Sequence, residues 1–187
     1  MKNNVKRTLL VLSLVAVVMV GSIAGTIAWL TAYTNPVTNT FTVGNITIEL
    51  AETTGTDYKV VPGVTDAKDP KVTVKSGSEK CYVYVLVENN LVIDGTVVAT
   101  VDIPSTWDTV ATSGNKTLYV HNAVVDAASA DVELPVFNQV TYADEEITEL
   151  NIASLAGKTI VVDAYAHQSA NVDQDDANSA AKAHFGF

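Results

Sequence analysis

The sequence has one cysteine, three histidines and none of the short motifs that mark common catalytic sites. The lone Cys81 excludes an intramolecular disulfide framework, so a packed core must stabilise the fold. The chain lacks a His-Glu-x-x-His zinc motif, a Gly-Lys-Ser/Thr phosphate loop and a Gly-x-Ser-x-Gly elbow. His121, His167 and His184 lie far apart, with none four residues from another. We therefore expect no catalytic, cofactor-binding or metal-binding residue.

Positive charge is also scarce. The chain has 11 Lys and Arg residues against 21 Asp and Glu residues, a net charge of −10. Such a chain repels nucleic acid and anionic lipid, so we expect neither as a partner. The run Asp173-Gln-Asp-Asp176 offers the oxygen ligands that Ca²⁺ prefers, but it lacks the Gly and final Glu of an EF-hand loop. A solvated helix cap is favoured there, and a Ca²⁺ site stays open as the alternative.

The most apolar segment lies at the N-terminus. Three basic residues precede an apolar run over residues 9–20, and small residues follow up to Ala28. These are the parts of a secretory signal peptide, which we predict over residues 1–28 with cleavage between Ala28 and Trp29. Cleavage removes three basic residues and no acidic one, so the net charge becomes −13. We therefore expect a secreted protein, found outside the cell or on its surface.

Retention of this segment is the alternative. Residues 8–30 carry no charge, which is near the length that spans a bilayer. The protein would then contact the membrane, but only through its uncleaved signal peptide. No basic stop-transfer cluster follows the segment, since the next charged residue after Arg7 is Glu49. Cleavage is the favoured interpretation.

After the predicted cleavage site the pattern is strand after strand, separated by Gly- and Pro-containing turns. This spacing predicts one all-β domain over residues 41–187, an antiparallel β-sandwich of the jelly-roll kind with a short C-terminal helix. The helix is expected around residues 179–184, and residues 143–150 are read as a short helical turn or a loop. The predicted strands cover residues 41–50, 71–75, 81–87, 96–103, 117–125, 132–140 and 159–167.

The strand over residues 81–87 is apolar on both faces, which predicts a central strand covered on two sides. Cys81 shares one face with Val83, Val85 and Val87. We interpret Cys81 as a small buried hydrophobic residue, and an intermolecular bridge is the alternative.

The layout resembles the TasA/camelysin family of exported bacterial fibre proteins, which a SipW-type signal peptidase processes. The resemblance implies a jelly-roll sandwich whose freed N-terminal strand inserts into the next subunit, giving extracellular fibres of a biofilm matrix. The sequence departs from the family pattern at residues 126–131, where a Gly-containing turn is usual, and after the cleavage site, where acidic residues are often seen. The residues that carry the resemblance are 25–32, 39–48, 61–63, 72–74, 81–85, Trp107, Tyr119, 135–137 and 161–168.

The residues themselves also favour strand donation. In an extended chain Trp29, Tyr33, Val37 and Phe41 point to one face. The Thr- and Asn-rich residues between them are poor helix formers, and Pro36 belongs on an edge or at a bulge. We predict residues 29–40, followed by Phe41, as the donor segment. Pairing within its own sheet, or a disordered terminus, is the alternative.

The sequence thus predicts a structural subunit and no enzyme. Its expected partners are other copies of itself in a head-to-tail homopolymer, a signal peptidase during export, and a minor co-assembling matrix protein. The acceptor groove is expected to be lined by apolar strand residues within 81–87 or 159–166. One rival is a monomeric exported module that binds a wall polymer or protein, and the other is a camelysin-like metallopeptidase, which no zinc motif supports.

Overall fold

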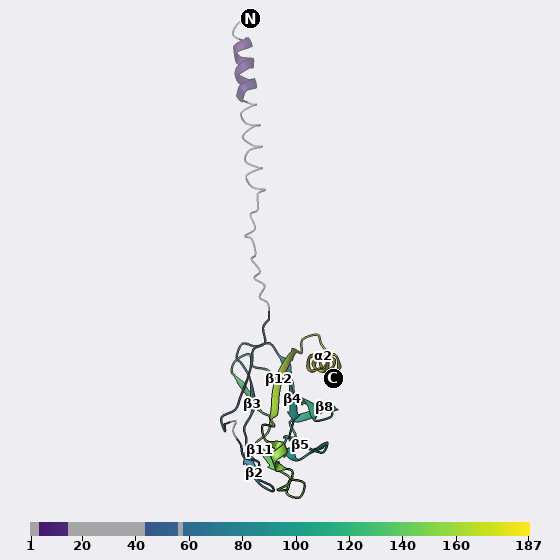
Figure 1. Ribbon diagram of the computed structural model, residues 1–187. Helices are drawn as coiled ribbons and strands as arrows, with labels where there is room; N and C mark the ends of the chain where they lie inside the picture. Colours follow the sequence, from purple (N-terminus) through teal and green to yellow (C-terminus); the bar gives the residue numbers. More distant parts are fainter. Residues whose placement is uncertain (1–3, 15–43, 56–57) are drawn as a thin grey trace. The chain divides into compact units, whose positions relative to one another are not determined.

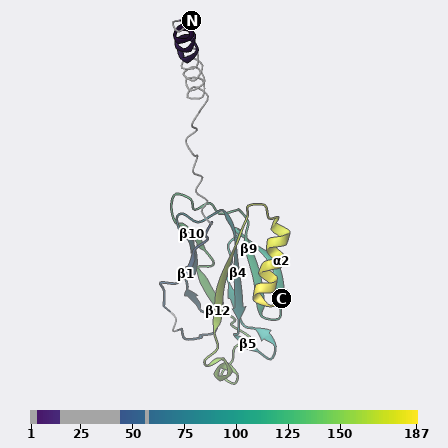
Figure 2. The ribbon, with the colours of Figure 1, turned by 90° about the horizontal axis from the view of Figure 1, so that it is seen from above.

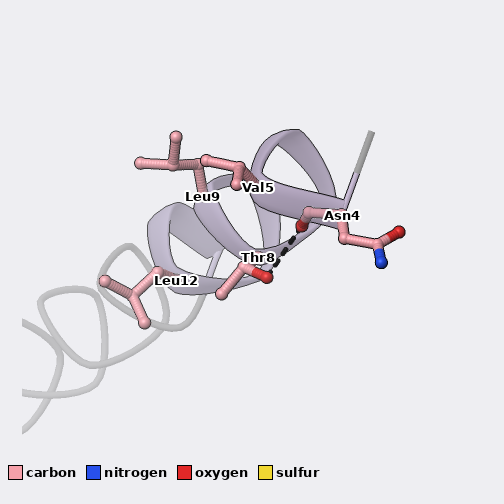
Figure 3. Close-up of a pocket in the computed structure, with 5 residues that line it drawn as sticks. All are labelled: Asn4, Val5, Thr8, Leu9 and Leu12. Carbon is pink, nitrogen blue, oxygen red and sulfur yellow. Dashed lines mark hydrogen bonds between the residues drawn. The ribbon is translucent and has the colours of Figure 1, made fainter. Parts of the chain in front are cut away.

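The computed structural model describes residues 4–14, 44–55 and 58–187, in two compact units, Met1–Thr42 and Val43–Phe187 (Figure 1). In the first unit, residues 4–14 form a helix. Thr8 Oγ1 donates a hydrogen bond to the Asn4 carbonyl oxygen at 2.8 Å, beside a shallow depression (Figure 3). All residues that line this depression belong to the one helix. None of the helices in the described ranges is long and apolar enough to cross a membrane.

The second unit is an all-β sandwich with a short C-terminal helix, as predicted. Its first sheet has the strand order β1-β3-β10, and a second ladder of order β2-β11-β7 continues it. Backbone bonds at 2.9 Å from Lys68 N to Asn138 O and from Val136 N to Pro70 O join the two ladders. The strands are β1 (Ile48–Ala51), β2 (Thr65–Ala67), β3 (Lys71–Val74), β7 (Ala99–Val101), β10 (Val132–Pro135) and β11 (Gln139–Tyr142).

The second sheet is antiparallel, with the order β12-β4-β9-β8. A small hairpin of β5 and β6 and a 3₁₀ helix lie outside both sheets. The bounds are β4 (Cys81–Asn89), β5 (Val92–Ile93), β6 (Thr96–Val97), β8 (Trp107–Ser113), β9 (Lys116–His121), η1 (Ile152–Leu155), β12 (Ile160–Gln168) and α2 (Gln174–Phe185).

Strand β4 is covered on both faces, which confirms the prediction from its two apolar faces. Cys81 and the valines at 83, 85 and 87 point into the core between the sheets, where Val72 and Val74 of β3 meet them. Tyr84 on the opposite face packs with Ala177 and Ala181 of α2 in a second cluster. Since these side chains are at most 3% exposed, β4 is the centre of the hydrophobic packing.

Helix α2 begins earlier than predicted and lies on the outer face of the second sheet (Figure 1). Asp173 is its N-cap residue but makes no side-chain capping bond, while Asp175 and Asp176 stand in the first turn, where acidic groups favour the helix dipole. Gly186 ends the helix in the left-handed conformation at φ 75°.

Several predicted boundaries need correction. Residues 44–47 are described and are not in a strand, so β1 begins at Ile48, and residues 41–43 lie outside the described ranges. The predicted strand over 96–103 is two short strands, and the one over 132–140 bends into β10 and β11. Residues 143–150 form bends and turns, and helical structure starts only at Ile152. Strands β2, β5 and β8 had no counterpart in the sequence analysis.

Candidate functional site

The edge strands β1 and β12 lie next to each other along one side of the sandwich (Figure 2). Within the described residues, β1 forms a ladder with β3 alone and β12 with β4 alone. Each strand therefore has one edge whose backbone donors and acceptors no strand pairs. Asp163 illustrates this, because its carboxylate accepts a hydrogen bond from the backbone N–H of Ala164 at 2.8 Å. A side chain there takes the place that a neighbouring strand would fill.

The core-facing side chains of β12 are incompletely covered. Ile160, Val162, Ala164 and Ala166 pack against the main core but remain half-buried, whereas the core-facing valines of β4 are at most 3% exposed. Strand β12 pairs with β4 over its whole length of nine residues, so its edge is long and regular. We use the name lateral groove for this apolar strip of β12 together with the edge of β1 that lies beside it.

The lateral groove deepens into two adjoining cavities at the start of β12. The smaller cavity is about 190 Å³, and Phe137 contributes to its lining. The larger is about 500 Å³ and reaches Val140 and Tyr142 of β11. Both cavities share Glu52, Lys68 and Ile160. The other residues that line the smaller cavity are Leu50, Ala51, Pro70 and Val162, and those that line the larger are Tyr58, Val60, Leu91, Gly157, Lys158 and Thr159.

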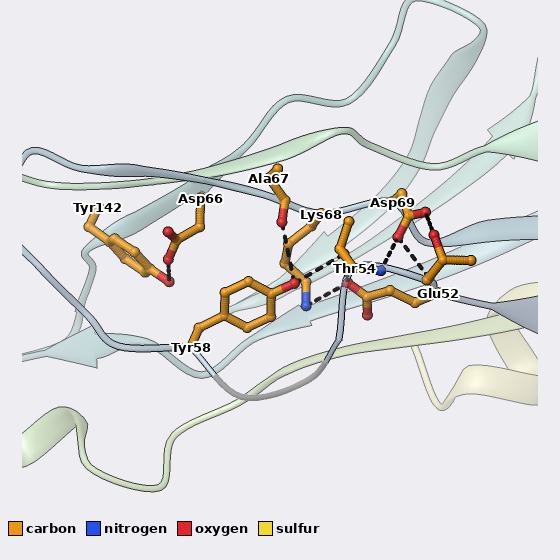
Figure 4. Close-up of polar contacts among 9 residues, drawn as sticks. Glu52, Thr54, Tyr58, Asp66, Ala67, Lys68, Asp69 and Tyr142 are labelled. Atoms are coloured by element: carbon orange, nitrogen blue, oxygen red, sulfur yellow. Dashed lines mark hydrogen bonds and ion pairs between the residues drawn. The ribbon is translucent and has the colours of Figure 1, made fainter.

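A set of polar contacts holds the wall of these cavities (Figure 4). Lys68 Nζ lies 2.8 Å from Glu52 Oε1, and both side chains are largely covered, at 14% and 20% exposure. The same ammonium stands 4.1 Å from the ring centroid of Tyr58, a cation–π geometry. Tyr58 donates its hydroxyl proton to the Ala67 carbonyl oxygen at 3.3 Å or to Thr54 Oγ1 at 3.0 Å. Residues before and after β2 are thereby tied together.

Two titratable groups at this wall have shifted pKa values. The Asp69 carboxylate accepts bonds from the backbone N–H groups of Thr53 at 2.8 Å and Thr54 at 2.9 Å, and from the Thr53 hydroxyl. These donors hold the pKa of Asp69 well below its usual range. Burial raises the pKa of Tyr142, whose hydroxyl donates to Asp66 Oδ2 at 2.9 Å. At neutral pH the Asp69 carboxylate therefore fixes the segment that follows β1.

The structure separates the two stretches predicted to hold the acceptor edge. Strand β4, which contains residues 81–87, pairs with β12 on one side and β9 on the other, so this stretch offers no unpaired edge, and its part in lining an acceptor groove stays a prediction. The stretch 159–166 coincides with the free edge of β12. The predicted cleavage site at Ala28 and Trp29, and the predicted anchors Trp29, Tyr33, Val37 and Phe41, lie outside the described residues.

Sequence reasoning missed the cavities and their polar wall. Glu52 and Lys68 are sixteen residues apart and belong to no recognisable motif. The alternation of Ile160, Val162, Ala164 and Ala166 was visible, and its change from large to small side chains was a usable signal. Across the described ranges, no three His, Cys, Asp or Glu side chains gather as a metal site.

Three comparisons were made with known proteins. No family model, no curated protein and no solved structure matches this chain.

Proposed function

We propose that this chain is an exported structural subunit that polymerises into extracellular fibres, each molecule placing its N-terminal arm, residues 29–41, in the lateral groove of the next. One observation carries the proposal: among the described residues no strand pairs with the regular outer edge of β12, whose core-facing side chains are only half-covered. A free edge with an apolar floor is the form that β-strand addition requires, because main-chain bonds give affinity and side-chain pockets give specificity. The resemblance to the TasA/camelysin family points the same way.

The energies are compatible with a stable joint. Each large anchor of the arm that enters the groove contributes roughly 1.5–3 kcal/mol. Each ladder bond adds about 0.5–1.5 kcal/mol. Ordering the arm and losing rigid-body freedom opposes these gains by ~10 kcal/mol or more. At the upper ends of these ranges, four anchors together with several ladder bonds offset this cost.

Processing is the natural trigger for assembly. While residues 1–28 are attached, the arm is held to the export site, and cleavage after Ala28 frees Trp29 and the residues behind it. A contact between an arm and a different surface of the next molecule does not close on itself, so it generates a filament. The signal peptidase therefore sets when and where fibres form.

The first experiment compares residues 29–187 with a chain that starts at Phe41, using negative-stain microscopy and size-exclusion chromatography. Filaments from the longer chain alone are expected. A matched pair of variants then tests the groove: Val162→Glu places a charge on the half-buried core-facing side of β12, and Val161→Glu places it on the outer face, where Val161 is 43% exposed. Assembly should fail with Val162→Glu and persist with Val161→Glu. Equal assembly by both variants would contradict the proposal.

A second candidate is the monomeric binding module, which the cavity of about 500 Å³ favours because Tyr58 and Tyr142 contribute to its lining. This function predicts that residues 29–187 stay monomeric at high concentration. It also predicts that Tyr142→Ala weakens retention on isolated cell-wall polymer while leaving the oligomeric state unchanged.

A further inference from the structure

Strand donation through the lateral groove has two possible polarities, and the fold distinguishes them. We infer that the arm of one molecule runs antiparallel to β12 of the next, with Phe41 at the start of β12 and Tyr33 near its end. This inference rests on the proposed function and adds the direction and register of the donated strand.

The two ends of the lateral groove differ. Asn45 accepts a bond from Glu79 N at 2.9 Å, and Thr47 accepts one from Lys75 N at 2.9 Å, so the chain approaches β1 beside the turn over residues 75–80. Strand β12 finishes at this same end, where Ser169 N donates to the Lys80 carbonyl oxygen at 2.9 Å. We call this the turn end. At the opposite end, the cavity end, Leu50 and Ala51 of β1 meet Ile160 of β12 around the smaller cavity.

The position of residue 44 then sets the polarity. The arm joins its own sandwich at the turn end, because Gly44 directly precedes Asn45. In a head-to-tail filament the turn end of the donor faces the cavity end of the acceptor. The arm must therefore enter the groove at the cavity end with Phe41 and reach toward the turn end with Trp29. Since β12 runs from the cavity end to the turn end, the two strands are antiparallel.

The opposite polarity gives a different assembly. An arm that entered at the acceptor's turn end would place the two turn ends face to face. Each arm would then reach the other molecule's groove, and the exchange would close as a two-fold pair. Such a pair leaves no free groove for growth. Fibre formation and antiparallel insertion are therefore linked by the fold.

Side-chain sizes along β12 support the same direction. The core-facing positions are Ile160 and Val162 near the cavity end and Ala164 and Ala166 near the turn end. Alanines leave room for the bulky N-terminal anchors of the arm. With Val37 opposite Val162, Tyr33 falls opposite Ala166, and Phe41 falls opposite Lys158, beside the cavity of about 500 Å³.

The lengths agree. The groove along the nine residues of β12 spans ~30 Å, and the extended arm over residues 29–41 spans ~43 Å. The arm is therefore long enough to fill the whole edge and still bring Phe41 past the start of β12. Odd-numbered arm residues face the core in this register, and even-numbered ones lie on the outer face, beside Val161 and His167.

The test uses two double-cysteine variants of the chain 29–187, whose added thiols all lie on the outer face of the second sheet. Thr38→Cys with Val161→Cys joins positions that the inferred register places opposite each other. Thr38→Cys with His167→Cys joins positions that only the reverse polarity brings together, since residues 161 and 167 are ~20 Å apart along the strand. A short bis-maleimide tolerates a register slip of two residues but not of six. The native Cys81 is fully buried and serves as the unreactive background.

A ladder of covalent multimers on a denaturing gel from the 38/161 variant, and none from the 38/167 variant, is expected. A ladder from the 38/167 variant alone would overturn the inferred polarity and leave strand donation intact. A cross-linked monomer from either variant would place the arm in its own groove, and intact fibres without any cross-link would place it away from β12. Both of these outcomes overturn the inference together with the proposed function.

Discussion

Trp107 Nε1 donates a hydrogen bond to the Pro135 carbonyl oxygen at 2.7 Å, which joins β8 of the second sheet to β10 of the first. Strand β8 is the edge opposite β12, and β10 is the edge opposite β1 in its ladder. The bond therefore closes the sandwich on the side away from the lateral groove. The indole is 5% exposed and also contacts the His121 ring edge-on, at a centroid distance of 5.3 Å. On the other side of the sandwich, the neighbouring strands are β1 and β12, each with an edge that no strand in the described residues pairs.

Replacing Trp107 by Phe should weaken this closure. The variant loses the indole N–H and part of a large buried surface, so we expect it to lower the free energy of unfolding by about 1–2 kcal/mol. Urea unfolding followed by circular dichroism measures the loss. Val124→Ala is the control, because Val124 is 45% exposed and its truncation should change stability by less than about 0.5 kcal/mol. An unchanged unfolding midpoint for Trp107→Phe would contradict the role assigned to the bond.

The ion pair of Lys68 and Glu52 should contribute more than an exposed pair does. Replacement of Lys68 by Met leaves the Glu52 carboxylate largely covered without its partner, so a loss of roughly 1–3 kcal/mol is expected. Lys116→Met is the matched control, because Lys116 and Glu88 are 41% and 28% exposed at 3.5 Å and should cost about 0–1 kcal/mol. Chemical denaturation of both variants gives the comparison. Equal losses would show that burial of the first pair has no energetic consequence.

The parts of the fold that the sequence predicted correctly are those fixed by residue periodicity. Strand β4 was found because its two apolar faces demand cover from both sides, and β12 because Val and Ala alternate with polar residues. Strand β8 was missed because five of its seven residues, over 107–113, are Asp, Thr, Ala or Ser on exposed or half-exposed positions. Such a strand is held by its partner β9, which a local pattern does not reveal.

The groove itself was predictable only in part. The apolar strip at 160–166 is visible in sequence, but whether that strip lies at an edge depends on which strands pair with it. Residues 81–87 were the other stretch expected to line the groove, and they lie between β12 and β9. The contact of Lys68 with Glu52 and Tyr58 depends on how the chain around β2 folds back over β1, and no spacing rule encodes it.

Asp69 should make the stability of the sandwich depend on pH in the acidic range. Its folded-state pKa lies well below the ordinary value of 3.8, so its contribution is complete above pH 3.8 and is lost progressively as the pH falls from that value toward the lowered folded-state pKa. The thermal midpoint of the wild-type protein should exceed that of Asp69→Asn at pH 7, and the difference should narrow steadily as the pH drops below 3.8. Glu149→Gln, at an exposed position, is the control. A difference between wild type and Asp69→Asn that does not change with pH would contradict this account.

Cys81 should be inert in the folded protein. It is fully buried, and burial raises the pKa of its thiol to about 11, so little thiolate is present at pH 8. We expect no reaction with a thiol reagent until denaturant is added, and then one equivalent per chain. Fibres should also form unchanged in the presence of a reducing agent. Rapid labelling of the native protein, or fibres that dissolve on reduction, would favour the intermolecular bridge.

Helix α2 should be held to the second sheet by its alanine face. Ala177 and Ala181 are fully buried against Tyr84, whose hydroxyl donates to Asn178 Oδ1 at 3.0 Å, so the helix approaches the sheet closely. Ala181→Glu forces a charged side chain into this contact and should lower the free energy of unfolding by about 2–4 kcal/mol. Ala183→Glu, two residues further on at an exposed position, keeps the same composition and should be nearly neutral.

Because α2 covers the outer face of the second sheet and the lateral groove lies along the edge of β12, the stability loss from Ala181→Glu should be separable from fibre formation. This expectation is met if Ala181→Glu still forms filaments below its lowered melting temperature. Equal stability of the two variants would contradict the packing of Ala181 against Tyr84.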